Sequence, residues 1–231
     1  MKRFYLGLVV LLVGLLLAPG SAVSGPYQQV SLSVTGVSPG AAGTFTFPAL
    51  NTVSGVLAGQ YNLLIDFDMG GPLASVKYAG FCVEDVYNPN GIMKYELIPI
   101  TEFGEGYLKA AYLEKEWLYG VRQYEAEIYQ TAIWELVLET TGAYGAATGT
   151  MTASNGSWAL KADALIGTIN LNGFDGAGFF IAHSPVGSVG KVYPQDYLIS
   201  VPVSEPATML LFGAGLIGLA GFGRKKLFKR A

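Results

Sequence analysis

The sequence predicts an α+β fold: a single mixed domain of mainly antiparallel strands with a central helical pair. Segments with strand-like alternation occur in both halves of the chain, and two segments of helical length lie between them. Gly- and Pro-containing turns separate neighbouring segments. Two further helices are expected at the ends, a signal helix at the N-terminus and a transmembrane helix at the C-terminus.

The first strand is predicted over Gln28–Val37, where polar and apolar side chains alternate. A Gly/Pro/Ser connection over Gly36–Gly43 separates it from a short strand at Thr44–Phe47. The remaining strand candidates are Gln60–Phe67, Ser75–Val83, Tyr95–Ile100, Gly178–Ala182, Val189–Tyr193 and Tyr197–Val201. Trp158–Asn170 is expected to hold a helical turn around Ala162–Leu165.

The central helices are predicted over Glu105–Leu118 and Tyr124–Glu139. At the helical repeat, one face of the second helix carries Ala126, Gln130, Ile133, Trp134 and Val137. The opposite face carries the acidic residues Glu125, Glu135 and Glu139. The apolar face should be buried, and an unpaired buried amide costs roughly 1–3 kcal/mol. The Gln130 carboxamide must therefore form hydrogen bonds or react.

Residues 1–24 are predicted to be a signal peptide. Lys2 and Arg3 are followed by the apolar run Leu6–Ala18 and then by small residues. Residues 25–202 remain as the folding domain, with seven basic and sixteen acidic residues and a net charge of about −9. Phosphate binding needs clustered Lys and Arg, so no nucleic-acid partner is expected. The only cysteine, Cys82, has no partner for an intramolecular disulfide, and without a further motif it is either a small buried apolar residue or a thiol that pairs with another chain.

Two motifs join this cysteine to the buried glutamine. Phe81-Cys82-Val83-Glu84 is followed by a helix around Tyr107–Leu113 and then by Tyr129-Gln130-Thr131-Ala132-Ile133-Trp134. Over roughly Gly80 to Leu138, this order and spacing resemble the thioester-forming (TQXA-type) domains of bacterial surface adhesins. The resemblance implies that the Cys82 thiol displaces ammonia from Gln130 and leaves an internal thioester. Ile133 and Trp134 would shield that bond from water, or are simply core residues.

The resemblance also implies an adhesin-like function. An amine on a surface target of unknown identity would attack the Gln130 acyl carbon and become attached through an amide bond. Each molecule would react once, so the chain is not expected to be an enzyme. No metal and no cofactor are expected, and the sequence shows no obvious base that would generate the Cys82 thiolate.

Residues 203–231 combine a short polar motif, Ser204-Glu205-Pro206, with the hydrophobic segment Ala207–Phe222 and a basic end. This tail resembles the PEP-CTERM sorting signal, with Ser-Glu-Pro in place of Pro-Glu-Pro. It implies an exosortase-type processing enzyme as partner and export to the envelope, surface or extracellular matrix of a Gram-negative bacterium. Before processing, the tail would hold the protein in the inner membrane; a simple C-terminal membrane anchor is the alternative.

Two other functions remain as alternatives. The chain is an exosortase-sorted structural protein of a biofilm or matrix, without a thioester, or it is a hydrolase. A Ser-His-Asp hydrolase would depend on the sole histidine, His183, and no nucleophile-elbow motif accompanies it. A surface or core role is therefore expected for His183.

Overall fold

The structure is a computed structural model that describes residues 27–48, 51–67, 76–84, 92–139, 144–146, 149, 151–184 and 195–201. Its elements in chain order are β1 (Gln28–Phe47), β2 (Asn51–Asp66), β3 (Val76–Cys82), β4 (Ile92–Pro99), the 3-10 turn η1 (Ile100–Glu102), α2 (Glu105–Tyr119), α3 (Ala126–Leu138), β5 (Thr152–Ala153), α4 (Gly156–Ile166), β6 (Phe179–His183) and β7 (Tyr197–Ser200).

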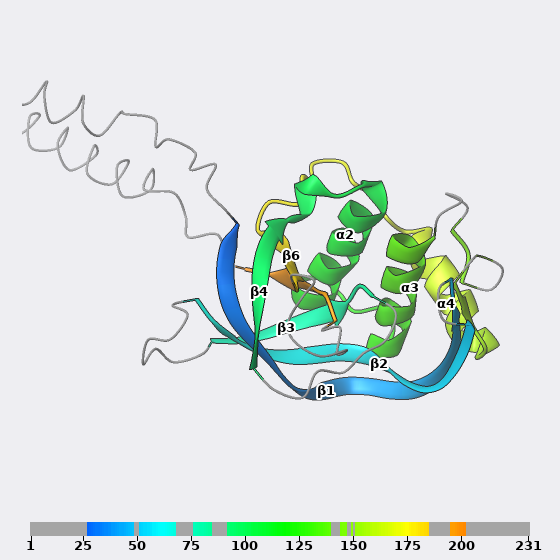
Figure 1. Cartoon of the computed structure of the whole chain (residues 1–231). Helices are drawn as coiled ribbons and strands as arrows, with labels where there is room; N and C mark the ends of the chain where they lie inside the picture. Colours follow the sequence, from blue (N-terminus) through cyan, green and yellow to red (C-terminus); the bar gives the residue numbers. More distant parts are fainter. Residues whose placement is uncertain are drawn as a thin grey trace, which may run out of the picture.

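Within these residues the strands form one seven-stranded sheet in the order β2-β3-β7-β6-β4-β1-β5, and the pairs are antiparallel. β1 also pairs with β2, so the sheet closes on itself. The long strands β1 and β2 form a curved ribbon beneath the helices, and α3 lies between α2 and α4 (Figure 1). The helix that carries Gln130 is therefore enclosed by the sheet and by two other helices.

The predicted break over Gly36–Gly43 is wrong, because β1 continues through it. The β1–β2 register shifts at three points along the ribbon, and at one of them Gly40 pairs with Gly59. A Cβ atom on Gly59 would lie 2.5 Å from the Gly40 Cα and 2.5 Å from the Pro39 carbonyl oxygen. These glycines let the two backbones approach and bend without ending the strand.

The predicted fold class is also wrong. The strands form a single antiparallel sheet that closes on itself, and among the described residues three α-helices pack on it instead of a central pair. The third helix, α4, was expected only as a turn around Ala162–Leu165. Its start lies in a Gly- and Ser-containing stretch that conceals the helical pattern, and Asn155 caps it by accepting the Ser157 N–H at 3.1 Å.

The terminal helices of the predicted fold lie outside the described residues, as does the strand predicted over Val189–Tyr193. Within the part of the chain that the structure describes, no helix combines the length and apolar character needed to cross a membrane.

Trp134 forms the centre of the core between α3 and β1. Its ring meets Phe45 and Phe47 edge-on, with centroids 5.1 and 5.3 Å apart, and all three side chains are buried. Edge-to-face packing of this kind adds to the stabilisation from buried area. It fixes the rotation of α3 over the sheet, and with it the direction of Gln130 one turn earlier.

Glu135 departs from the predicted exposed face of this helix, since it is 0% exposed. Its Oε1 accepts the Gly145 N–H, so the segment after α3 folds back over it. Burial raises the pKa of Glu135 to about 7, and the nearby negative charges of Glu139 and Asp163 act in the same direction. The helical pattern identified the apolar face correctly but could not show that α4 and the following segment cover the other side.

Glu135 should make stability depend on pH. Because its folded pKa lies above its unfolded value, its stabilising contribution is complete below about pH 4.5 and is lost as pH rises through about 7. The wild-type protein should lose up to about 3 kcal/mol of its free energy of unfolding over this pH range, and Glu135→Gln should not show this loss. Urea unfolding from pH 4 to 8 measures it, with Glu127→Gln, at a partly exposed site on the same helix, as control. If the free energy of unfolding varies with pH in the same way in wild type and Glu135→Gln, Glu135 is not the cause of the dependence.

The close approach at Gly59 has a matched control within the same ribbon. Gly36 and Gly59 adopt similar backbone angles, with φ of 152° and 156°, but a Cβ on Gly36 would meet no atom within 4 Å. We expect Gly59→Ala to lower the free energy of unfolding by about 1–3 kcal/mol more than Gly36→Ala. Chemical denaturation followed by circular dichroism gives the difference, and equal losses would show that the contact is unimportant.

Candidate functional site

The structure brings Cys82 and Gln130 together. Cys82 ends β3, where it pairs with Tyr197 of β7, and Gln130 lies in the second turn of α3. The Gln130 Oε1 accepts the Cys82 N–H at 3.1 Å, and its Nε2 donates to the Cys82 carbonyl oxygen at 2.7 Å. Both residues are 0% exposed. The carboxamide thus continues the hydrogen bonding of the strand and lies against the residue that carries the thiol.

The Cys82 sulfur is held by the backbone of Glu84. The thiol donates to the Glu84 carbonyl oxygen at 3.0 Å, and the Glu84 N–H donates to the sulfur at 3.4 Å. Burial raises the pKa of Cys82 far above its ordinary value, and the charges of Glu84 and Asp196 raise it further. The sulfur is therefore a protonated thiol at neutral pH, and its acidic neighbours oppose formation of the thiolate.

The two predicted shielding residues lie beside this contact. Ile133 and Trp134 are both 0% exposed. The Trp134 Nε1–H donates to the Glu84 carbonyl oxygen at 3.2 Å, the same oxygen that accepts the Cys82 thiol. Trp134 therefore contributes to the site through a hydrogen bond as well as through packing.

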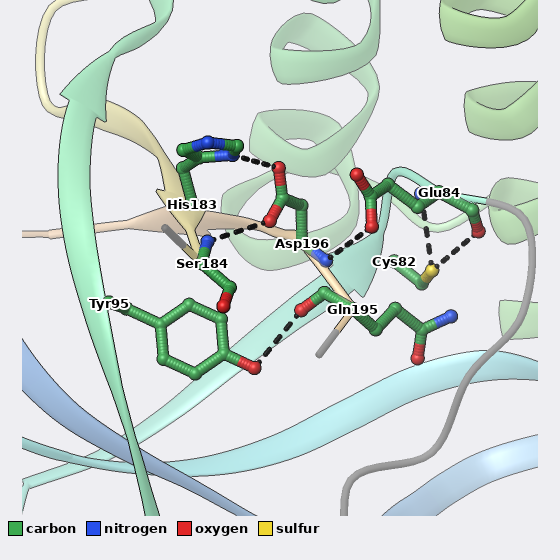
Figure 2. A network of polar contacts seen from close by, with 7 residues as sticks. All are labelled: Cys82, Glu84, Tyr95, His183, Ser184, Gln195 and Asp196. Atoms are coloured by element: carbon green, nitrogen blue, oxygen red, sulfur yellow. Dashed lines mark hydrogen bonds and ion pairs between the residues drawn. The ribbon is translucent and has the colours of Figure 1, made fainter. Parts of the chain in front are cut away.

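A polar network missed by the sequence analysis extends from this point (Figure 2). The Asp196 N–H donates to Glu84 Oε2 at 3.2 Å. The Asp196 carboxylate lies 2.6 Å from His183 Nδ1 through Oδ2 and accepts the Ser184 N–H at 2.9 Å through Oδ1. Burial raises the pKa of Asp196, and the contacts with His183 and Ser184 lower it. No local motif signals this network, because Glu84 and Asp196 are 112 residues apart.

Three tyrosines close the site on the sheet side. Tyr61 and Tyr197 pack with ring centroids 5.3 Å apart, and the Tyr95 hydroxyl donates to the Gln195 carbonyl oxygen at 3.1 Å. Burial raises the pKa of all three phenols. They are neutral groups, so they add no charge to the surroundings of Cys82.

Among the described residues, no group of three or more His, Cys, Asp or Glu side chains is arranged to hold a metal ion. His183 is bound to Asp196 and lies at the end of β6. The sorting-motif residues Ser204, Glu205 and Pro206 lie outside the described residues.

Comparison with known proteins identifies the tail. The PEP-CTERM protein-sorting motif matches residues 202–225, which include the Ser204-Glu205-Pro206 segment. The sorting-tail prediction is thus confirmed, and the thioester-domain resemblance stays a prediction. No curated protein and no solved structure matches the chain. The matched motif implies a protein that a Gram-negative bacterium exports, that is anchored in the membrane at first and that an exosortase then processes.

Proposed function

We propose that the chain is an exosortase-sorted surface or matrix protein whose folded domain forms an internal Cys82–Gln130 thioester for covalent attachment to an amine-bearing target. The observation that carries the proposal is the pair of hydrogen bonds, at 3.1 and 2.7 Å, between the Gln130 carboxamide and the Cys82 backbone. The Gln130 carboxamide, a buried electrophile, lies against the backbone of the residue that carries the single thiol of the chain, which brings together the two partners of an intramolecular acyl transfer.

The first step forms the thioester. The Cys82 thiol turns from the Glu84 carbonyl oxygen and its sulfur attacks Cδ of Gln130. The Cδ–Nε2 bond breaks, and Nε2 leaves as ammonia with the thiol proton. The Cys82 N–H already donates to Oε1, the atom on which negative charge develops in the tetrahedral intermediate, so it acts as one oxyanion donor. The Cys82 carbonyl oxygen holds the departing Nε2.

The second step transfers the acyl group. A neutral primary amine of the target attacks Cδ, an amide bond forms, and the Cys82 sulfur leaves with the proton that the amine loses. Ile133 and Trp134 keep water from the bond until the target arrives, which is consistent with their complete burial. The chain carries out this reaction once, so it acts as a covalent linker and not as an enzyme.

Effective concentration makes the first step feasible. An amide does not exchange with a free thiol at a useful rate in water, but a fixed intramolecular pair gains an effective molarity of about 10⁵ M or more. Ammonia then diffuses away, and its dilution opposes the reverse reaction. No metal or cofactor takes part in either step.

A structural matrix protein without a thioester is the second candidate. One observation favours it: the Gln130 carboxamide and the Cys82 thiol each have the hydrogen-bond partners that a buried structural side chain needs. In that case Gln130 serves only to satisfy the end of β3. The sorting motif is common to both candidates, since it concerns export and processing and not the folded domain.

Intact mass separates the two candidates. We expect the folded chain to be lighter than its sequence by one ammonia and to gain methylamine when that amine is added. Cys82→Ala should keep its full mass because it has no sulfur nucleophile. Gln130→Glu is the matched control on the acyl side, since its carboxylate has no ammonia to lose.

A folded wild-type chain with the full sequence mass and one thiol that reacts after unfolding would overturn the thioester. Loss of ammonia that persists in Cys82→Ala would place it at another amide. Hydroxylamine gives an independent readout, because it cleaves a thioester under conditions that leave amides intact.

A further inference from the structure

The position of the Cys82 sulfur depends on the short segment 82–84. The Glu84 carbonyl oxygen accepts the Cys82 thiol at 3.0 Å and the Trp134 Nε1–H at 3.2 Å, and the Glu84 N–H points to the sulfur. A shift of Glu84 would therefore move the sulfur relative to the Gln130 carboxamide. The contacts that fix Glu84 therefore also fix the position of the sulfur in the proposed reaction.

Asp196 holds this segment from the start of β7. Its backbone N–H donates to Glu84 Oε2 at 3.2 Å, and its carbonyl oxygen accepts the Val83 N–H at 3.1 Å. Its carboxylate points to the opposite side, toward the His183 ring and the Ser184 N–H at the end of β6 (Figure 2). Asp196, which directly precedes β7, therefore forms hydrogen bonds with residues at the ends of both β3 and β6.

The carboxylate is well suited to this fixed role. The Asp196 side chain is 10% exposed and that of His183 is 36% exposed, so the ring stands between the carboxylate and solvent. A buried carboxylate needs hydrogen-bond partners, and here the His183 ring and the Ser184 N–H face it. Further titratable groups lie near the pair: Glu84, Glu96 opposite His183 on β4, and Tyr107 of α2. Burial raises the pKa of Tyr107, and the Asp196 and Glu84 charges raise it further.

We propose that Asp196, braced by His183, is a positioning residue for the acyl transfer between Cys82 and Gln130. This inference rests on the proposed function. Asp196 acts through Glu84 and forms no bond to the reacting atoms; its effect is to keep the sulfur within reach of Gln130 Cδ. Displacing a reacting atom by an ångström slows such a reaction by about a hundredfold.

The test follows ammonia loss by intact mass after the full chain is refolded from denaturant. We expect Asp196→Ala to slow ammonia loss by about tenfold or more. Asp196→Asn keeps an oxygen for the Ser184 N–H and should restore the rate to within about threefold of wild type. Glu125→Gln, at an exposed carboxylate paired with Lys161, makes the same acid-to-amide change elsewhere and should leave the rate unchanged.

A carboxylate with only a structural role would lower the unfolding temperature without changing this rate in the folded protein. Ammonia loss at the wild-type rate in folded Asp196→Ala would therefore overturn the inference. If that variant does not fold, His183→Ala takes its place, since it removes only a partly exposed ring. It should slow ammonia loss by about threefold, and an unchanged rate would count against the proposal.

A second measurement distinguishes failure of the proposed thioester from failure of the positioning role of Asp196. If the wild-type chain loses no ammonia, the thioester is absent, and the reactivity of the free thiol tests the positioning alone. A small neutral disulfide should then react with Cys82 about fivefold or more faster in Asp196→Ala than in wild type, because the loosened segment exposes a buried sulfur. Equal thiol reactivity would overturn the role of Asp196.

Discussion

The contact between the Gln130 carboxamide and the Cys82 backbone determines how the helices and the sheet fit together. A strand end buried in the core has an N–H and a carbonyl oxygen that need partners, and here a helix side chain provides both. Removing that side chain would leave two buried backbone groups unpaired, at about 1–3 kcal/mol each. The contact therefore fixes the position of α3 along β3, and the packing of Trp134 on Phe45 and Phe47 fixes its rotation.

The surroundings of α3 explain why most of its polar groups are paired within the protein. The helix is covered by the sheet, α2 and α4, and little of it meets solvent. Thr131 turns its hydroxyl back to the Glu127 carbonyl oxygen at 2.7 Å, and Glu135 accepts a backbone N–H from the segment that follows the helix. Gln130, Thr131 and one oxygen of Glu135 are thus paired locally or by a neighbouring segment, as burial favours, whereas the buried Glu135 Oε2 accepts no hydrogen bond from the described residues.

The sequence predicted local features better than global ones. Helical periodicity located α2 and α3, and the paired motifs pointed to the contact between Cys82 and Gln130. The closed sheet was missed because the glycines of β1 resemble turn residues, and only the pairing of Gly40 with Gly59 reveals that they allow a bend. The burial of Glu135 depends on the segment that folds back after α3, and the link from Glu84 to Asp196 joins residues 112 apart; no periodic pattern within one element records either contact.

The same interactions serve both proposed roles of Cys82, as a structural core residue and as one half of a thioester, and the raised pKa of its thiol suits each. Burial and two neighbouring carboxylates raise the pKa of Cys82, so the thiolate is disfavoured both as attacking nucleophile and as leaving group. A structural cysteine gains from this, because it stays protonated and unreactive. A thioester gains as well, because a poor leaving group in a dry site resists hydrolysis. The cost falls on the step that forms the bond, where fixed geometry must replace thiol acidity. That requirement explains why a linker of this kind would need the sulfur held through Glu84 and Asp196 as firmly as the carboxamide is held by the strand.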